Sequence, residues 1–274
     1  MAERDGEKVR ALRAEDIPAA FALSAHAGWN QTEEDWRMLL DLAPDGCLAI
    51  EVDGKIAATT TLLCYGQRLA WIGMVLTRLE YQRRGLARRL LTKALAQAEQ
   101  MKIETIKLDA TDQGRPLYEE FGFHSEQAIE RWSRPGRTVS QFLTTRPVVE
   151  EVWRDSDSAV FGTDRSQMLE RLAPRSISWS VSQSYLFARP GRVTAYLGPC
   201  VSENPVTARH LIDQSLQNTG CNWSWDLFPR NQDAVALARD LGFTPQRHLV
   251  RMARGKALQQ KTTSIYAIAG FELG

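Results

Sequence analysis

The sequence predicts an α/β (α+β) protein that contains two similar domains. Strand-like and helix-like segments alternate along its 274 residues, and a pattern in the first half returns in the second. Between the halves, residues 134–157 are less periodic and include the loop-forming pair Pro135-Gly136. We therefore expect one domain at residues 1–142 and another at residues 143–274.

Short local signals mark the ends of the strands and helices in the first half. Asp53-Gly54 predicts a hairpin turn, and Thr32 with Asp35 three residues on predicts a helix start with a capping box. Gly122 after a short helical run predicts a helix end. The expected strands are residues 9–12, 47–52, 56–64, 71–77, 103–110 and 125–132, and the expected helices begin near residues 17, 33, 86 and 116.

The second half repeats this plan about 120 residues later. A glycine-containing strand, a helix and a further strand lead to Gly242-Phe243, as they lead in the first half to Gly122-Phe123. The expected elements are a strand ending at Gly198, a helix at residues 207–216, a strand at residues 223–228 and a helix capped by Asn231. One module used twice explains this order.

Composition and charge narrow the function classes. A formal net charge of +1 gives no concentrated positive field, so we expect no binding to nucleic acid or to an acidic membrane. No run approaches the roughly 18 apolar residues of a membrane span, and the charged start lacks a signal-peptide core. The four cysteines lack the paired spacing of a zinc site, so we expect reduced thiols and no bound metal. These features are typical of a cytoplasmic enzyme.

The most informative segment is the loop that follows the strand at residues 71–77. It contains Gln82, Arg83, Arg84 and Gly85, and a long amphipathic helix begins directly after the glycine. The exposed N–H groups of such a helix start bind phosphate well, and a glycine lets the anion approach the backbone. The sequence contains no Gly-x-Gly-x-x-Gly and no Gly-Lys-Ser/Thr loop, which argues against dinucleotide binding and nucleotide hydrolysis.

The order of the motifs around this loop carries a resemblance. A strand, Gln82-x-x-Gly85-x-Ala87, a helix, a strand and then a Leu-Tyr-Glu-Glu-Phe-Gly-Phe run resembles the GNAT superfamily of N-acetyltransferases. The resemblance covers residues 8–132 and implies that each domain is a mixed, mostly antiparallel twisted sheet flanked by helices. It also implies that acetyl-CoA is the acyl donor. The residues implied to bind it are Met74, Val75, Leu76, Gln82, Arg83, Arg84, Gly85, Leu86 and Ala87, the first three through backbone contacts with the pantetheine arm.

Tyr118 matches the tyrosine that protonates the departing thiolate in many members of this superfamily. A phenol has a pKa of about 10, so it can donate a proton and still be protonated at neutral pH. The base that receives the proton of the acceptor amine is not evident, because Trp71 and Gly73 stand where members with a glutamate base place it. Asp109, at the end of the next strand, is either a site residue or a structural one.

The loop with Trp29 and Asn30 lies where superfamily members place acceptor contacts, so we expect these two residues to form an acceptor wall. In the second half, residues 202–208 replace the phosphate loop and contain neither glycine nor arginine, and Ala238 replaces the tyrosine. Both changes remove what CoA chemistry needs. We therefore expect a degenerate second domain that binds no cofactor, similar to tandem members of the superfamily.

Two features of the second half are candidates for the acceptor side. Trp223 lies on a strand with alternating aromatic and polar residues, and it is either an acceptor contact or a core tryptophan. The apolar C-terminus contains one acid, Glu272, and is expected to pack against the protein rather than extend from it. This terminus is a candidate to reach the site of the first domain.

Together these features predict the transfer of an acetyl group from acetyl-CoA to the primary amine of a small metabolite, by direct attack in a ternary complex. Two alternatives stay open: acetylation of a protein or peptide amine, and a non-catalytic CoA-binding sensor. A second domain beside the cleft favours the small acceptor, whereas the lack of an evident base keeps the sensor open. We expect a monomer or a homodimer.

Overall fold

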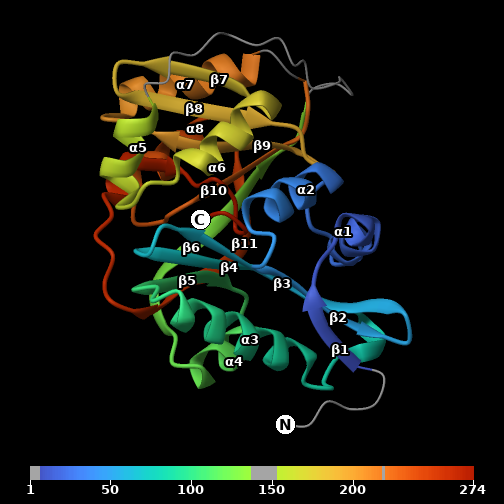
Figure 1. Cartoon of the computed structure of the whole chain (residues 1–274). Helices are drawn as coiled ribbons and strands as arrows, with labels where there is room; N and C mark the ends of the chain where they lie inside the picture. The colour runs from blue at the N-terminus through green and yellow to red at the C-terminus, as the bar shows by residue number, and fades with distance from the viewer. Residues whose placement is uncertain (1–6, 137–152, 218–219) are drawn as a thin grey trace.

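The computed structural model describes residues 7–136, 153–217 and 220–274, which form twelve β-strands and eight α-helices (Figure 1). The strands of the first half are β1 (Glu7–Ala11), β2 (Cys47–Val52), β3 (Lys55–Tyr65), β4 (Leu69–Thr77), β5 (Thr105–Ala110) and β6 (His124–Arg134). Its helices are α1 (Ile17–His26), α2 (Glu33–Leu42), α3 (Leu86–Gln100) and α4 (Arg115–Glu120).

The second half follows the same order of elements, except that its described part begins with a helix where the first half begins with β1, and it ends with an additional short strand. Its strands are β7 (Ile177–Val181), β8 (Ser184–Arg189), β9 (Ala195–Val201), β10 (Trp223–Leu227), β11 (Thr244–Gly255) and β12 (Ile265–Ala267). Its helices are α5 (Trp153–Phe161), α6 (Ser166–Leu172), α7 (Pro205–Gln217) and α8 (Gln232–Asp240). The predicted α/β class and the mixed, mostly antiparallel sheet flanked by helices are confirmed.

Local chemistry explains several element ends. The capping box at α2 is confirmed, because the Thr32 hydroxyl accepts from the Asp35 N–H at 3.2 Å and the Asp35 carboxylate accepts from the Thr32 N–H at 2.7 Å. Asp53 and Gly54 both have positive φ, +48° and +73°, as a two-residue hairpin requires. Asn231 caps α8 through its side-chain oxygen. These ends were predictable because each depends on neighbouring residues alone.

One predicted strand end is wrong. The strand that contains Gly198 does not stop there but continues as β9 to Val201. Cys200 and Val201 pair with β8 on one side and with β12 on the other, so the ladder continues past Gly198. Gly198 lies within the strand because both neighbouring strands extend beyond it.

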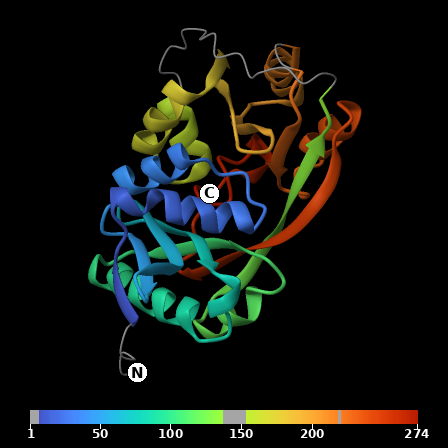
Figure 2. The same ribbon diagram turned by 90° about the vertical axis from the view of Figure 1, so that its right-hand side faces the viewer.

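The two halves share one continuous sheet in the order β1-β2-β3-β4-β5-β11-β6-β10-β9-β8-β7, with β12 on β9. β6 and β11, the last long strand of each half, lie side by side at its centre, where Figure 2 shows them in green and orange-red. β11 also pairs with β5, and β6 also pairs with β10. Each half therefore contributes a strand to the other. The predicted boundary between residues 142 and 143 lies outside the described residues.

Two buried ion pairs hold these interleaved strands at equivalent positions. Arg251 on β11 donates two hydrogen bonds of 2.9 Å to Asp109 on β5. Arg131 on β6 donates two hydrogen bonds of 2.7 Å to Asp226 on β10. Bidentate arginine–carboxylate contacts are geometrically specific. The pairs therefore fix how β11 aligns with β5 and how β6 aligns with β10.

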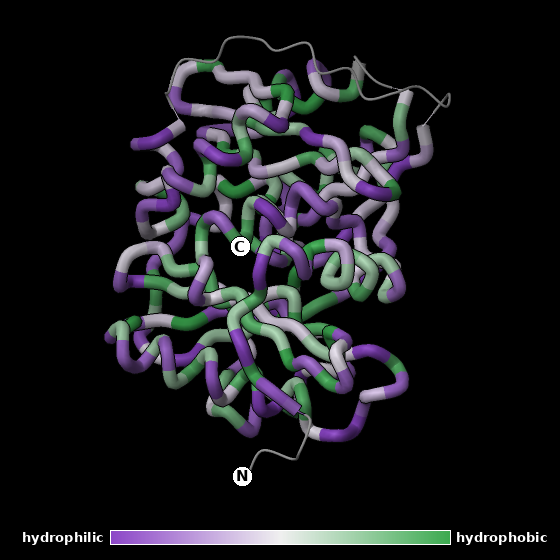
Figure 3. Tube along the Cα trace, turned by 45° about the vertical axis from the view of Figure 1, so that its right-hand side comes forward, coloured by the Kyte–Doolittle hydropathy of each residue, from purple (hydrophilic) through white to green (hydrophobic). Residues whose placement is uncertain are grey.

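The halves also share a hydrophobic core. In the first half, α3 and α4 cover one face of the sheet and α1 and α2 cover the other, and α2 continues into contact with α6 of the second half (Figure 1). The core under α1 and α2 contains Trp71 from the first half together with Phe161 and Leu273 from the second. The C-terminus lies between the halves, near the centre of the molecule (Figure 3). This placement brings the last residues beside β4.

Candidate active site

The site begins where two neighbouring strands part. β4 and β5 are parallel and pair only over Leu69–Trp71 and Thr105–Lys107. Further along, β4 contains a bulge, because Met74 and Val75 together oppose one residue of β3, and Met74 has a φ of +49°. A bulge bends its strand and ends regular pairing. The parted strands border a cavity of about 630 Å³, lined by residues 72–77 of β4 and by Leu108 and Asp109 of β5.

The arginine-rich loop closes one end of this cavity. Arg83 and Gly85 have φ values of +59° and +82°, and α3 begins directly after the glycine. A left-handed conformation favours glycine, and Gly85 and the first residues of α3, Leu86 and Ala87, line the cavity. The predicted cofactor residues that line the cavity are Met74, Val75, Leu76, Gln82, Arg83, Gly85, Leu86 and Ala87. Arg84 does not line it but pairs with Glu7 at 2.8 Å.

Tyr118 lies in the wall of the same cavity, on α4. Its ring is buried and packs edge-on against Phe123, with the ring centroids 6.1 Å apart. The hydroxyl forms no hydrogen bond with any described residue, so its proton is available to a ligand. Burial raises the pKa of Tyr118 to about 12 because the charged phenolate is poorly solvated there. The group is therefore a proton donor that stays protonated across the physiological pH range.

The C-terminal tail reaches this cavity, as the sequence suggested. Tyr65 donates a hydrogen bond of 2.6 Å to the carbonyl of Leu273, and Trp71 donates one of 2.8 Å to the carbonyl of Phe271. A Cβ atom built on Gly73 would lie 3.1 Å from the Cα of Glu272, so the tail passes directly over this glycine. Phe271 and Glu272 then line the cavity.

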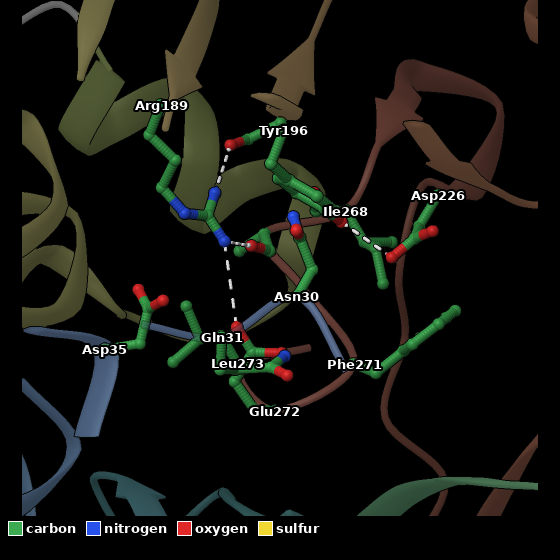
Figure 4. A network of polar contacts seen from close by, with 12 residues as sticks. Asn30, Gln31, Asp35, Arg189, Tyr196, Asp226, Ile268, Phe271, Glu272 and Leu273 are labelled. Atoms are coloured by element: carbon green, nitrogen blue, oxygen red, sulfur yellow. Dashed lines mark hydrogen bonds and ion pairs between the residues drawn. The ribbon is translucent and has the colours of Figure 1, made fainter. Parts of the chain in front are cut away.

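Glu272 is a buried carboxylate with only 4% of its surface exposed. Its Oε2 accepts a hydrogen bond of 2.8 Å from the amide of Gln31, and its Oε1 lies 3.7 Å from the guanidinium of Arg189 (Figure 4). Burial raises the pKa of Glu272, although Arg189 opposes this shift. A buried acid with a raised pKa is a better proton acceptor than an exposed one. Superfamily members with a glutamate base place it where this chain has Trp71 and Gly73. Here the C-terminal tail brings Glu272 to Gly73.

The residues predicted for the acceptor side separate into two groups. Trp29 and Asp109 line the cavity, although the carboxylate of Asp109 is already held by Arg251. Asn30 instead joins the halves, because its side-chain oxygen accepts from the N–H groups of residues 193 and 194. Trp223 lies in the core of the second half and not among the residues that line the cavity.

The cavity wall also contains residues that the sequence did not predict, among them Gln31, Arg131 and Arg247. Gln31 follows the predicted pair directly, but an isolated glutamine carries no signal. Arg131 and Arg247 face each other across β6 and β11. Only the interleaving of these strands places them beside a site built on β4 and β5, and no local pattern predicts that interleaving.

The corresponding place in the second half is filled. β9 and β10 are parallel and pair only over residues 195–197 and 223–225, and then they part as β4 and β5 do. There β12 pairs with β9, and the N–H of Ile268 donates a hydrogen bond of 3.1 Å to the carbonyl of Asp226 on β10. The chain itself therefore occupies the gap. The second half therefore differs from the first both in this gap and in the lack of glycine and arginine at residues 202–208.

Other features of the described ranges set the chemical context. In residues 7–136, 153–217 and 220–274, no His, Cys, Asp or Glu side chains group as a metal site requires. No helix in these ranges is long and apolar enough to cross a membrane. No disulfide joins the cysteines of the described residues, and Cys47 and Cys200 are buried.

Comparisons with known proteins match both halves. Residues 10–123 match the acetyltransferase (GNAT) family, and residues 154–267 match an acetyltransferase (GNAT) domain. The uncharacterised N-acetyltransferase YitH of Bacillus subtilis (strain 168) is 30% identical over 181 residues, which span 63% of this chain but only 62% of the relative.

Solved structures show a similar fold. A candidate acetyltransferase from Pyrococcus horikoshii has a TM-score of 0.88 and 22% identity, over 100% of this chain and 98% of that one. A tandem GNAT protein of the clavulanic acid biosynthesis pathway has a TM-score of 0.59 and 15% identity, over 93% of this chain and 100% of that one.

Proposed function

Because the chain belongs to the GNAT family of acetyltransferases, we propose that it transfers an acetyl group from acetyl-CoA to the primary amine of a small metabolite. The observation that carries this proposal is a single cavity that joins a phosphate-binding helix start, an unpaired strand edge and a buried tyrosine. The backbone along Met74–Leu76 is free to pair with the pantetheine arm as an added strand. Arg83, Gly85 and the start of α3 are then placed to hold the pyrophosphate.

The proposed reaction is direct attack by the amine on the thioester carbonyl, with both substrates bound at once. Holding the two reactants in one cavity supplies much of the rate. Tyr118 donates its proton to the sulfur as the C–S bond breaks, so that a neutral thiol leaves. The tail over Gly73 narrows the cavity, which favours a small acceptor over an extended peptide.

In this proposal, residues 1–142 carry the donor site and residues 143–274 form a scaffold for the acceptor side. The second half binds no acetyl-CoA, because β12 occupies its gap. Cysteines that form no disulfide among the described residues are compatible with a reducing compartment, so we place the reaction in the cytoplasm.

Calorimetric titration with acetyl-CoA tests the donor site. We expect one site per chain. The Gly85→Asp variant should bind at least about tenfold more weakly, because its carboxylate would face the pyrophosphate. Gly85→Asn is the matched control, since Asn and Asp both tolerate positive φ and differ here by one charge. Two sites per chain, or equal effects of both variants, would contradict the proposal.

An assay of CoA release over a panel of small amines and N-terminal peptides tests the acceptor class. Release with small amines supports the proposal, and release with peptides alone indicates protein acetylation. Tight acetyl-CoA binding without release over the whole panel would indicate a CoA sensor.

A further inference from the structure

We propose that the acceptor is an amine that also carries an acidic group, such as an amino acid. Its ammonium would lie between Glu272 and Gln31, and its acidic group would contact Arg247. This proposal rests on the proposed function and narrows its acceptor class. All three residues line the cavity that holds the donor site.

The ammonium subsite consists of Oε1 of Gln31 and the carboxylate of Glu272, which are both buried. Gln31 donates through Nε2 to Glu272, because an ionised carboxylate can only accept hydrogen bonds. This leaves Oε1 of Gln31 buried and without a hydrogen-bond partner among the described residues. An unpaired buried acceptor is costly, and an ammonium group would satisfy it. Gly270 makes room for the carboxylate, because a Cβ atom there would lie 2.6 Å from Oε1 of Glu272.

The subsite for the acidic group is the side chain of Arg247. The register of β11 with β6 shifts between Pro245 and Arg247, which marks a β-bulge that bends the strand just before Arg247. Arg247 is half-buried, and it forms no hydrogen bond or ion pair with any described residue. Burial and the neighbouring Arg131 both lower the pKa of Arg247. A half-buried cation beside a like charge is a favourable place for an anion.

Nearby acids do not supply that anion. Asp226 is the acid that attracts Arg247, but its two oxygens already accept from Arg131, and one of them also accepts from Tyr196 at 2.9 Å. Arg131 acts electrostatically on both Glu272 and Arg247, and its guanidinium lies 4.6 Å from the ring of Phe271. Both subsites therefore lie near Arg131 in the wall of one cavity, where one acceptor can contact them together.

The chemistry balances with these groups. The ammonium gives one proton to the Glu272 carboxylate, and the neutral nitrogen forms a bond to the thioester carbon. The C–S bond breaks, the sulfur takes the proton of Tyr118, and the second proton of the nitrogen restores Tyr118. Glu272 then releases its proton to solvent. The products are an N-acetylated acid, CoA and one proton.

Kinetics with matched acceptors test the proposal. The probes are L-leucine, L-phenylalanine and L-glutamate, each compared with its α-carboxamide. The wild type should prefer the acids. Arg247→Met should lower kcat/KM for the acids by about tenfold to hundredfold, should lower it much less for the uncharged amides, and should leave the acetyl-CoA affinity unchanged. Arg254→Met is the matched control on the same strand, because this residue is paired with Glu99 away from the cavity.

Glu272→Gln should lower kcat for acids and amides alike and remove an ionisation from the pH profile. In the wild type, the rate should rise with pH as Glu272 loses its proton, and burial places this rise above the ordinary pKa of a glutamate. The charged and titratable groups around Glu272 are Arg189 on β8, Arg131 on β6, Asp35 on α2, Tyr196 on β9 and Tyr65 on β3.

Calorimetric binding of L-leucine and its amide to the protein–CoA complex provides a readout that needs no turnover. Preference for the acid that Arg247→Met abolishes supports the subsite even if no CoA is released, in which case only the proposed function fails. Equal use of acids and amides by the wild type would overturn the proposal. So would a loss of acetyl-CoA affinity in Arg247→Met, because Arg247 would then be a ligand of the donor.

Discussion

The gap between β4 and β5 and the gap between β9 and β10 begin in the same way and end differently. Each pair of parallel strands is joined for three residues and then parts. In the first half the gap opens on the cavity, next to a helix start with glycine and arginine. In the second half the gap holds β12, and the indole of Trp225 donates a hydrogen bond of 2.7 Å to the carbonyl of Tyr266 on that strand.

The difference shows how one half can fill such a gap with its own chain while the other half leaves it open. A parted strand pair exposes unpaired backbone groups, which need a partner. A ligand is one such partner and a segment of the chain is another. Here the segment that fills the second gap continues directly to Phe271 and Glu272 in the first cavity. The degenerate half therefore contributes the tail that shapes the acceptor side of the other.

The largest expected effect comes from removing the hydroxyl of Tyr118. Tyr118→Phe should lower kcat by about 10²- to 10³-fold, because the thiolate would leave without a proton donor, and acetyl-CoA affinity should change little. Tyr266→Phe is the matched control, since it removes a hydroxyl from a buried tyrosine in the filled gap and should leave kcat unchanged. Steady-state kinetics and calorimetry distinguish the two.

The pH dependence of the wild type gives a second readout of the same group. Tyr118 donates only in its protonated form, which is lost as pH rises through its pKa of about 12. Ionisation of Tyr118 should therefore cause no loss of kcat below about pH 10. An unchanged kcat in Tyr118→Phe would show that another group protonates the sulfur.

A smaller but still large effect is expected from the two ion pairs that hold the interleaved strands. Asp109→Asn would leave Arg251 fully buried without a charge partner, and we expect a loss of about 3–5 kcal/mol in the free energy of unfolding. Asp226→Asn should cost less, because 15% of the Arg131 side chain remains exposed to water. Urea unfolding measures both.

The control for these variants is Glu119→Gln, which breaks an exposed pair with Arg115 and should cost less than about 1 kcal/mol. If Asp109→Asn were as mild as this control, the interleaved strands would be held by backbone pairing and packing alone.

The contrast between the gaps also separates what the sequence can reveal from what it cannot. The phosphate loop, Tyr118 and the capping box at Thr32 depend on residues that are close in sequence, so the sequence could predict them. The absence of glycine and arginine at residues 202–208 predicted a degenerate half for the same reason. The sequence could not predict that β12 fills the gap of this half. A strand of three residues is too short for a periodic pattern, and its partner β9 lies about sixty residues earlier.

The acceptor side was the hardest part to predict. Glu272 reaches the cavity through contacts with Tyr65 and Trp71, which are about two hundred residues away in sequence. Arg247 reaches it because β11 lies between β5 and β6. Trp29 and Asn30 were adjacent candidates, yet only Trp29 lines the cavity, because the Asn30 side chain turns toward residues 193 and 194. The orientation of the Asn30 side chain therefore depends on contacts with the second half, which the sequence around Asn30 does not contain.

The smallest expected effect distinguishes two adjacent arginines in the loop that the second half lacks. Arg83 lines the cavity and forms no ion pair with a described residue, whereas Arg84 pairs with Glu7 at 2.8 Å and lies over the ring of Tyr81. Arg83→Ala should weaken acetyl-CoA binding about fivefold at low salt, as the loss of one exposed charge contact costs about 1 kcal/mol. Added salt should reduce this difference, because the contact is open to solvent. Arg84→Ala should change the affinity less, because the Arg84 side chain is held by Glu7 and does not line the cavity. Equal losses of affinity in both variants would mean that Arg84 leaves Glu7 and contacts acetyl-CoA. The donor site would then use two arginines of this loop, whereas residues 202–208 of the second half contain none.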